Sequence, residues 1–359
     1  MSKRVLVINF GSTSSKFAIY KDGLEERKGA VDYSREELEE FSGINDQIPL
    51  RYESVISFLN ENNCSLEDFD AMIGRAGGTA PICGVYEINE RMVDKLLNHS
   101  KVRHVANLCG VIAFELAKRT GIPAYISSFA EDSMLAETKI SGLPQIRRKS
   151  EGHMENWYAV SRKVCKKIGK KYEESNLIVA HMGGGTTIGL HMGGKIVDVI
   201  GDTEGAFGPE RSGGLPLHGY LDMVLQGGYS EEELLLMMRG KGGLYAYTGT
   251  TDARAVEREI ANGNKEWEIV YRAMALQEAK AIASLAATAK GNIDGIALSG
   301  GLSRSKMFVG WIRKYTEFIA PVYIFPGEFE MEAMAMSVWD AMEGKAPIHE
   351  YTKEIDDRD

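Results

Sequence analysis

The first polar residues of the chain form a short turn between two apolar runs. Val5–Ile8 and Phe17–Tyr20 are predicted strands, and the turn Asn9–Lys16 carries three serines, a threonine and a lysine beside its backbone N–H groups. Such donors can hold phosphate oxygens, because phosphoryl transfer depends on positioned hydrogen bonds, a metal ion and cations around the β- and γ-phosphates. Taken alone, the turn is equally consistent with an ordinary polar β-turn.

A second turn of the same design opens the other half of the chain. Leu177–Ala180 and Ile188–Met192 flank His181–Thr187, which contains three consecutive glycines. Aligning Gly11 with Gly183 superimposes the hydroxyl-rich positions of both turns, half a chain length apart. We therefore expect a duplicated α/β domain, with two phosphate-facing turns that meet across a cleft.

The elements that must position these turns alternate between helix and strand. Amphipathic stretches such as Ser54–Asn60 and Val111–Arg119 alternate with short apolar runs such as Ala71–Ile73 and Ala124–Ile126. This alternation is typical of α/β proteins. The longest predicted helix is Trp267–Lys290. Because the 359 residues exceed the roughly 250–300 at which a single core stops growing, we expect two domains.

Other nucleotide and metal sites are excluded by spacing. A Walker loop needs Ser or Thr after its Gly-Lys pair, whereas the four Gly-Lys pairs of this chain are followed by Lys, Ile, Gly or Ala. Ile188 occupies the place of the third glycine in a dinucleotide-binding fingerprint, which disfavours a Rossmann dehydrogenase. No His-Glu-x-x-His segment is present, so a zinc hydrolase is not indicated.

Composition and charge exclude further classes of function. The formal net charge of −9 and the lack of a basic run argue against a nucleic-acid partner. No apolar stretch approaches the ~20 residues that cross a bilayer, and the apolar run after Arg4 is too short for a secretion signal. We therefore expect no membrane association and a cytoplasmic location. The four cysteines match neither a zinc ribbon nor a redox pair, and we expect them to be reduced.

The turn Asn9–Lys16 resembles the N-terminal phosphate signature of the acetate and butyrate kinase family, which belongs to the superfamily of actin, Hsp70 and the sugar kinases. Further segments match the family in the same order, so the resemblance covers nearly the whole chain. These segments are 74–78, 104–108, 181–187, 207–213, 249–254 and 325–331. The order Pro-Glu-Arg-Ser-Gly at 209–213 and Pro-Gly-Glu at 326–328 is more similar to the butyrate kinases.

The resemblance implies a particular fold and set of partners. The fold would be the ribonuclease H-like domain of actin-like ATPases in two copies, each with a mixed five-stranded sheet flanked by helices, and an active-site cleft between the lobes. We expect a first lobe at 1–172, completed by a C-terminal helix at 327–359, and a nucleotide-binding lobe at 173–326. The resemblance also implies ATP or ADP, a small carboxylate or acyl phosphate, Mg²⁺, and a homodimer or larger homo-oligomer.

Roles for individual residues follow from the same resemblance. Arg75 and Arg211 would flank the transferring phosphoryl group, since a planar guanidinium can bind carboxylate or phosphoryl oxygens bidentately, and His153 would stabilise the transition state. Mg²⁺ would be held by Asn9 and Glu330. Glu328 is the alternative register for Glu330. The nucleotide- and phosphate-binding residues would be Asn9, Ser12, Ser14, Lys16, His181, Gly183, Gly184, Gly185, Thr186, Asp252, Arg254, Gly300, Gly301 and Leu302. The acceptor side would be lined by Gly77, Gly78, His104 and Asn107.

These residues also have structural explanations, and one position departs from the family. The arginines could form surface ion pairs, and Glu330 could be a first-turn carboxylate favoured by the helix dipole. His153 could be a structural histidine. Ser127 and Ser128 stand where relatives usually have an aspartate. That loss matters less for a carboxylate, whose pKa near ~4.5 leaves it ionised at pH 7 without a general base, than for a sugar hydroxyl.

We therefore predict reversible ATP-dependent phosphorylation of butyrate or a close homologue by direct in-line transfer, giving ADP and an acyl phosphate. Acetate, propionate or a branched-chain acid is an alternative acceptor. A sugar kinase of the same superfamily is disfavoured by the missing aspartate, and an actin- or Hsp70-like nucleotide switch by the sixteen residues that remain after Glu343. Acyl chain length, physiological direction and the size of the oligomer stay open.

Overall fold

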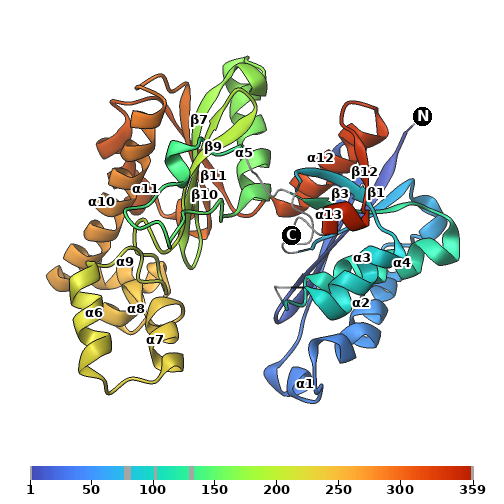
Figure 1. Ribbon diagram of the computed structural model, residues 1–359, viewed down its shortest axis with the longest axis horizontal. Helices are drawn as coiled ribbons and strands as arrows, with labels where there is room; N and C mark the ends of the chain where they lie inside the picture. Colours follow the sequence, from blue (N-terminus) through green and yellow to red (C-terminus); the bar gives the residue numbers. More distant parts are fainter. Residues whose placement is uncertain (1, 77–81, 101–102, 129–132, 357–359) are drawn as a thin grey trace. The chain divides into compact units, whose positions relative to one another are not determined.

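The computed structural model describes residues 2–76, 82–100, 103–128 and 133–356. The chain divides into two compact units (Figure 1). Unit 1 comprises residues 1–132 and 330–359, and unit 2 comprises residues 133–329. Within the described parts of the chain, no helix is both long enough and apolar enough to span a membrane. Unit 1 is therefore built from both ends of the sequence, and unit 2 from one continuous segment.

Unit 1 contains a mixed sheet of seven strands in the order β12-β5-β6-β4-β1-β2-β3. The strands are β1 (Arg4–Gly11), β2 (Ser14–Lys21), β3 (Leu24–Asp32), β4 (Ala71–Gly74), β5 (Gly84–Glu87), β6 (Ala124–Ser128) and β12 (Ile348–Glu350). β1, β2 and β3 form an antiparallel meander, whereas β4 pairs in parallel with both β1 and β6. The first predicted hairpin is present, and its strands are β1 and β2.

This sheet has two more strands than the five we expect from the sequence. β5 pairs antiparallel with β6, and β12 pairs in parallel with β5. Tyr86 of β5 packs against the rings of His349 and Tyr351, whose centroids lie 5.1 and 6.3 Å from its own. The extra strands cover an edge that β6 would otherwise leave open for pairing with another chain. The C-terminal segment is thus not a single helix, because a strand follows its main helix.

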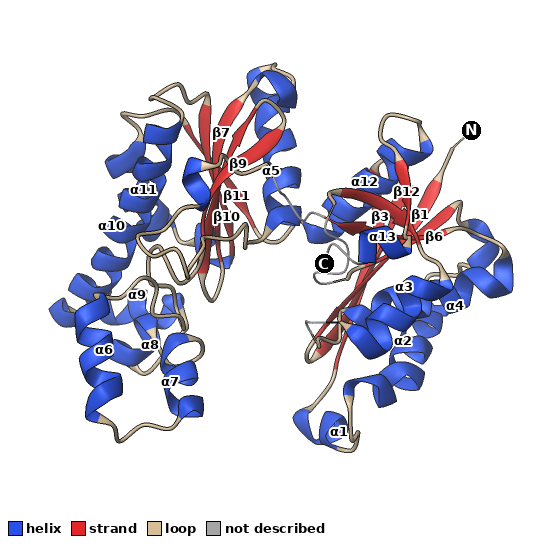
Figure 2. Cartoon of the chain, in the orientation of Figure 1, coloured by secondary structure: helices blue, strands red, loops and turns tan. Residues whose placement is uncertain are grey.

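Three helices of unit 1 pack directly on its sheet, namely α2 (Ile48–Glu61), α4 (Asn107–Thr120) and α12 (Glu330–Met342) (Figure 2). The unit also contains α1 (Arg35–Glu39), α3 (Glu90–Asp94), which packs on α4, and α13 (Lys353–Asp356). Leu6 and Ile8 of β1 belong to a core shared with α2 and α4, whereas Val5 and Val7 belong to a second core shared with α12. β1 is apolar at successive positions because successive side chains point to opposite faces and both faces are buried.

Unit 2 repeats the strand order of unit 1. Its five-stranded sheet has the order β11-β10-β7-β8-β9, which corresponds to β6-β4-β1-β2-β3. The strands are β7 (Asn176–Met182), β8 (Thr186–Met192), β9 (Lys195–Ile200), β10 (Gly295–Gly300) and β11 (Val322–Pro326). β7 and β8 are antiparallel, and β10 pairs in parallel with β7 and β11. The duplication predicted from the two hairpins is confirmed, because each hairpin occupies the same place in its sheet.

The helices of unit 2 flank its sheet and extend beyond it (Figure 1). They are α5 (Met154–Ile168), α6 (Leu217–Gln226), α7 (Glu231–Met238), α8 (Gly243–Thr248), α9 (Ala253–Ala261), α10 (Lys265–Thr288) and α11 (Lys306–Thr316). α5 packs against β7 and β10, while α10 packs against α11 and β8. Trp157 of α5 is fully buried over Gly189, where a Cβ atom would come within 2.8 Å of the indole ring. The predicted long helix is α10.

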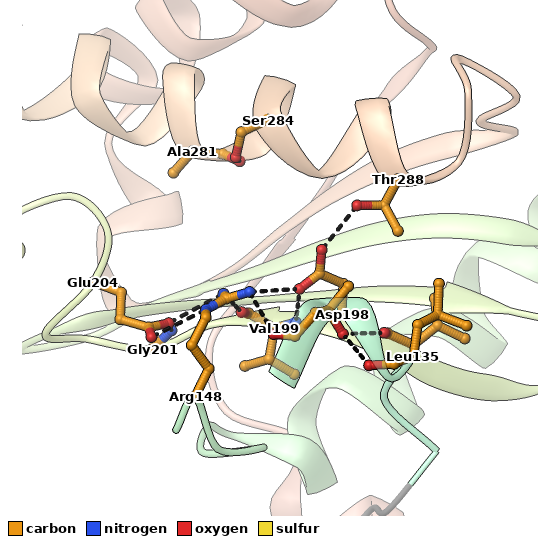
Figure 3. A network of polar contacts seen from close by, with 11 residues as sticks. Leu135, Arg148, Asp198, Val199, Gly201, Glu204, Ala281, Ser284 and Thr288 are labelled. Atoms are coloured by element: carbon orange, nitrogen blue, oxygen red, sulfur yellow. Dashed lines mark hydrogen bonds and ion pairs between the residues drawn. The ribbon is translucent and has the colours of Figure 1, made fainter. Parts of the chain in front are cut away.

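Residues 133–150 form a strap along β9, the edge strand of the unit 2 sheet. The Leu135 N–H donates to the Val197 carbonyl at 3.0 Å near the start of the strap. Near its end, Arg148 makes hydrogen bonds to other residues of unit 2 (Figure 3). Arg148 donates to Asp198 at 3.3 Å and to Glu204 at 3.1 Å, and Asp198 also accepts from Thr288 of α10 at 2.8 Å. Because of these contacts and of α5, the boundary between the units falls after residue 132 rather than after residue 172.

Replacement of Arg148 by alanine should destabilise unit 2. The change leaves the buried Asp198 carboxylate without its guanidinium partner, which costs about 2–4 kcal/mol of unfolding free energy. Urea denaturation would measure the loss, and amide hydrogen exchange should speed up along the strap. Arg147→Ala is the matched control, because Arg147 is the exposed neighbour on the same strap. Equal stability of the two variants would contradict the assignment.

Candidate active site

A buried arginine holds the turn between β1 and β2. Arg51 of α2 is fully buried and donates hydrogen bonds to the backbone carbonyls of Ser14 and Ser12 at 2.7 and 3.1 Å. Its guanidinium also lies over the rings of Tyr33 and Phe10, 4.4 and 5.5 Å from their centroids. Arg51 was not predicted as a functional residue. The only sequence signal is its place on the otherwise apolar face of α2.

The predicted phosphate-binding residues of unit 1 differ in exposure. Asn9 lies in β1 opposite Lys16 of β2, and its side chain is buried. Ser12 is exposed at the tip of the hairpin, whereas Ser14 and Lys16 are partly buried. The structure thus brings these four residues onto one hairpin, with hydroxyl and backbone donors at its tip. Their contact with phosphate stays a prediction.

Arg75 follows β4 directly and is tied to the same hairpin. The Arg75 N–H donates to the Ile8 carbonyl of β1 at 3.0 Å. Gly74 lets α4 approach, because a Cβ atom there would lie 2.5 Å from the carbonyl carbon of Cys109. Burial lowers the pKa of His104, and the positive charge of Arg75 lowers it further. Arg75 and His104 therefore lie near each other at the carboxyl ends of β1 and β4, while the predicted Gly77 and Gly78 lie outside the described residues.

A pocket of about 310 Å³ opens beside the start of α4. Its lining includes the predicted acceptor residues His104 and Asn107 and the apolar side chains of Ile44, Leu96 and Leu97. Asn107 donates a hydrogen bond to the Ser100 hydroxyl at 3.1 Å, which orients its amide. The pocket combines polar groups at one helix end with an apolar wall.

The two candidate metal-binding glutamates belong to different units. Glu330 begins α12 in unit 1, the unit that also contains Asn9, and both side chains are buried. Glu328 lies in unit 2, close enough to His181 to oppose the fall in the pKa of that histidine. The described residues contain no ready cluster of three or more His, Cys, Asp or Glu side chains for a metal. An amide oxygen and one carboxylate fit Mg²⁺, which usually keeps several waters and completes its shell with phosphate oxygens.

In unit 2, the glycine turn after β7 lies directly against the segment that carries Arg211. The Glu210 N–H donates to the Gly184 carbonyl at 3.1 Å, and a Cβ atom on Gly184 would lie 2.6 Å from the Glu210 carboxylate. A Cβ atom on Gly185 would collide with the Arg211 side chain. A side chain at either position would force the Glu210 or the Arg211 side chain to move. The turn and Arg211, two separate predictions, are therefore neighbours.

His153 and His181 stack at the start of the glycine turn. Their ring centroids lie 4.1 Å apart, and His153 Nδ1 shares a hydrogen bond of 2.9 Å with the Thr187 hydroxyl. Burial lowers the pKa of His181 to about 4, so this ring is neutral at pH 7. Stacking on His153 is then free of charge repulsion. His153 thus lies close to the turn, whereas the predicted phosphate ligand His181 is a buried residue at the end of β7.

A buried carboxyl group lies behind the same turn. Glu278 of α10 is 1% exposed and interacts with the Thr186 hydroxyl. Burial raises its pKa to about 8, so Glu278 is mainly protonated at pH 7. This residue was not predicted from the sequence, where a glutamate in a long helix is indistinguishable from a solvated one.

A pocket of about 700 Å³ lies beside the glycine turn, within unit 2. Six predicted residues line it, namely Gly183, Gly184, Asp252, Arg254, Gly301 and Leu302. Gly300 is not in the lining; it bends the chain beneath with a φ of +86°. The lining also includes Glu257, Arg304 and Lys306, which were not predicted. The pocket therefore offers charges of both signs next to the glycine turn.

Residues 124–312 match the acetokinase family. Butyrate kinase 2 of Clostridium acetobutylicum is 38% identical to this chain over 355 residues, which cover 98% of the chain and 100% of the relative. Butyrate kinase 1 of the same organism is 38% identical over 352 residues, with 97% and 99% coverage. The chain belongs to the acetokinase family.

Membership of the acetokinase family agrees with the fold. The crystal structure of Porphyromonas gingivalis acetate kinase superimposes with a TM-score of 0.76 at 20% identity, covering 94% of this chain and 99% of that one. At this identity the likeness concerns the fold alone. The two mixed sheets and their repeated strand order are thus features of an acetokinase, and the resemblance noted in the sequence is confirmed.

Arg51→Met should loosen the first hairpin of this acetokinase without changing any residue of the turn itself. The change leaves the Ser12 and Ser14 carbonyls without their donor, so we expect a loss of about 2–4 kcal/mol of unfolding free energy. Urea denaturation would measure it. Arg91→Met, at an exposed position of unit 1, should cost little. An Arg51→Met protein as stable as Arg91→Met would refute the role of Arg51 in holding the turn.

Proposed function

We propose that this protein catalyses the reversible transfer of the terminal phosphoryl group of ATP to a short-chain carboxylate, giving ADP and an acyl phosphate. Butyrate or a close homologue is the proposed acceptor. The observation that carries the proposal is the 38% identity to two butyrate kinases over essentially the whole chain. The gathering of the glycine turn, Arg211 and a large pocket in unit 2 supports it.

In this proposal, unit 2 binds the nucleotide. The adenosine occupies the pocket of about 700 Å³, and the phosphates lie along the glycine turn, where they meet backbone N–H groups. Arg211 then contacts the transferring phosphoryl group, and His153 lies beside it. Catalysis consists of positioning and charge stabilisation, which supply most of the acceleration in phosphoryl transfer.

Unit 1 supplies the acceptor side. Arg75 binds the carboxylate, and the pocket beside His104 and Asn107 takes its acyl chain. A carboxylate is ionised at pH 7 and attacks phosphorus without losing a proton, so no general base is required. Ser127 is buried and Ser128 partly buried at the end of β6, and neither is a base at this pH.

Magnesium fits the residues proposed for it. Asn9 and Glu330 would hold the ion through an amide oxygen and a carboxylate, the hard oxygen ligands that Mg²⁺ prefers. When bound, Mg²⁺ neutralises charge on the β- and γ-phosphates.

Two other functions are less well supported. Acetate, propionate or a branched-chain acid would use the same residues, and only the acyl pocket would distinguish them. A sugar kinase needs a base for its hydroxyl acceptor, and β6 ends in serines where an aspartate would serve. A nucleotide switch would hydrolyse or bind ATP without any acceptor.

The proposal is tested by incubating the protein with MgATP and each of a series of two- to six-carbon acids, with hydroxylamine to trap acyl phosphate. We expect hydroxamate with the highest kcat/KM for a four-carbon acid. A glucose and mannose series, followed by ADP release, serves as the control for a sugar kinase. Absence of hydroxamate with every acid would contradict the proposed function.

Arg75→Ala and Arg211→Ala should each lower kcat about 10³-fold or more, the effect expected of arginines that stabilise a transferring phosphoryl group. Both variants should fold, because these arginines lie at the ends of strands and loops rather than in a core. Arg91→Ala in unit 1 and Arg313→Ala in unit 2 are matched controls at exposed positions. Full activity of a folded Arg211→Ala protein would remove Arg211 from the mechanism.

A further inference from the structure

Asp202 is a buried carboxylate shared by two arginines of unit 2. Arg211 donates from Nη1 to Oδ2 of Asp202, and Arg239 donates from Nη2 to Oδ1 at 3.0 Å. The Asp202 side chain is 9% exposed, whereas those of Arg211 and Arg239 are 31% and 54% exposed. The carboxylate is therefore covered by the protein, while both guanidinium groups still reach solvent.

Backbone pairing fixes Arg239 beside Arg211. The two residues form an isolated antiparallel bridge. On either side of it, the Ser212 N–H donates to the Met238 carbonyl at 3.1 Å, and the Gly240 N–H donates to the Glu210 carbonyl at 2.8 Å. Arg239, which directly follows α7, is thus paired with the segment that contacts the glycine turn. A surface ion pair would not need this support.

The charges of this group favour an anion. Two adjacent guanidinium groups repel each other, and Asp202 offsets only one of their two charges, so the group keeps a net positive charge. Burial lowers the pKa of Arg211 and the charge of Arg239 lowers it further, in line with this closeness. Each guanidinium has five N–H donors, and the shared carboxylate uses few of them. The Nε–H of Arg211 is buried and has no hydrogen-bond partner among the residues that the structure describes.

Asp198, another buried aspartate of unit 2, belongs to a network whose arginine has its donors used within the protein. Asp198 pairs with Arg148, Thr288 and a backbone N–H, and Arg148 uses its remaining donors on Glu204 and on carbonyl oxygens (Figure 3). That network is complete within the protein. The Asp202 group leaves donors over, and one of them, the Nε–H of Arg211, lies beside Gly185.

We propose that Arg239 is a second arginine that contacts the transferring phosphoryl group, and that Asp202 is the residue that positions Arg211 and Arg239 for this contact. The inference rests on the proposed function for the identity of the anion. Arg239 would contact the reacting group itself, whereas Asp202 would act only by positioning the two arginines. A polyanionic phosphoryl group receives two planar cations from one side, held apart by a fixed carboxylate rather than by solvent.

The test uses Arg239→Gln, Arg239→Lys and Asp202→Asn in the full-length protein, with exposed Arg313→Gln and Asp222→Asn as controls. Calorimetry measures the Kd of MgADP and of the MgATP analogue AMP-PNP, which differ by the terminal phosphoryl group. We expect Arg239→Gln to weaken AMP-PNP binding at least fivefold and leave the Kd of MgADP within twofold. Asp202→Asn should do the same, because Oδ1 and Oδ2 each accept from one guanidinium, and asparagine replaces one of these oxygens by an NH2 group that only donates.

Activity gives the second readout. Arg239→Gln and Asp202→Asn should each lower kcat about 10- to 100-fold, a loss of the size that follows when catalytic groups are misplaced by about 1 Å, and Arg239→Lys should recover part of it. Because both residues act on one group, the double variant should lose less than the product of the single losses. The two controls should behave as the unmodified protein.

Two outcomes would overturn the inference. One is unchanged kcat and AMP-PNP binding in folded Arg239→Gln. The other is equal weakening of MgADP and AMP-PNP binding, which would mean that Arg239 and Asp202 only maintain the fold. If the unmodified protein forms no acyl phosphate with any acid, the proposed function fails, while the comparison of MgADP with AMP-PNP still decides the role of Arg239.

Discussion

The site in unit 2 depends on the absence of side chains at Gly184 and Gly185. Glu210 and Arg211 fill the space that a Cβ atom would need at these positions, so two segments of chain can run in contact. That contact places the Arg211 cation beside the turn, and Gly183 and Gly184 of the same turn line the large pocket. A methyl group at Gly185 would displace the Arg211 side chain, and a methyl group at Gly184 would displace the Glu210 carboxylate.

Three buried or half-buried arginines differ in how many of their guanidinium N–H donors are hydrogen-bonded within the protein. This difference distinguishes a structural arginine from one that can bind a substrate. Arg51 donates hydrogen bonds to carbonyl and amide oxygens of unit 1, and its guanidinium plane stacks on aromatic rings. Arg148 donates hydrogen bonds to the strap and to β9. Arg211 donates one hydrogen bond to Asp202, and its Nε–H group is not used within the described part of the protein. A guanidinium whose donors are all used can hold a segment in place, but it has nothing left for a substrate.

The features predicted correctly from the sequence are those encoded by neighbouring residues. Contacts between residues far apart in the chain were not predicted. The two hairpins, the glycine turn and α10 have local patterns, and all were found. Arg148 with Asp198, Arg239 with Asp202, and β12 with β5 join residues far apart in the chain, and each partner looks like a solvated residue by itself. The buried state of Glu278 was hidden for the same reason. The metal-binding roles proposed for Asn9 and Glu330 rest on the family resemblance, since their spacing alone does not indicate a shared metal.

The division of unit 1 between the two ends of the chain bears on how the protein is made. Unit 2 is continuous and can complete its core while the ribosome still holds the last segment. Unit 1 cannot, because Met334 and Val338 of α12 cover one face of its sheet and β12 closes its edge. Its first 132 residues therefore leave an apolar face uncovered until residues 330–350 have been synthesised. We expect unit 2 to complete its core before unit 1, the reverse of the usual order in which the N-terminal domain folds first.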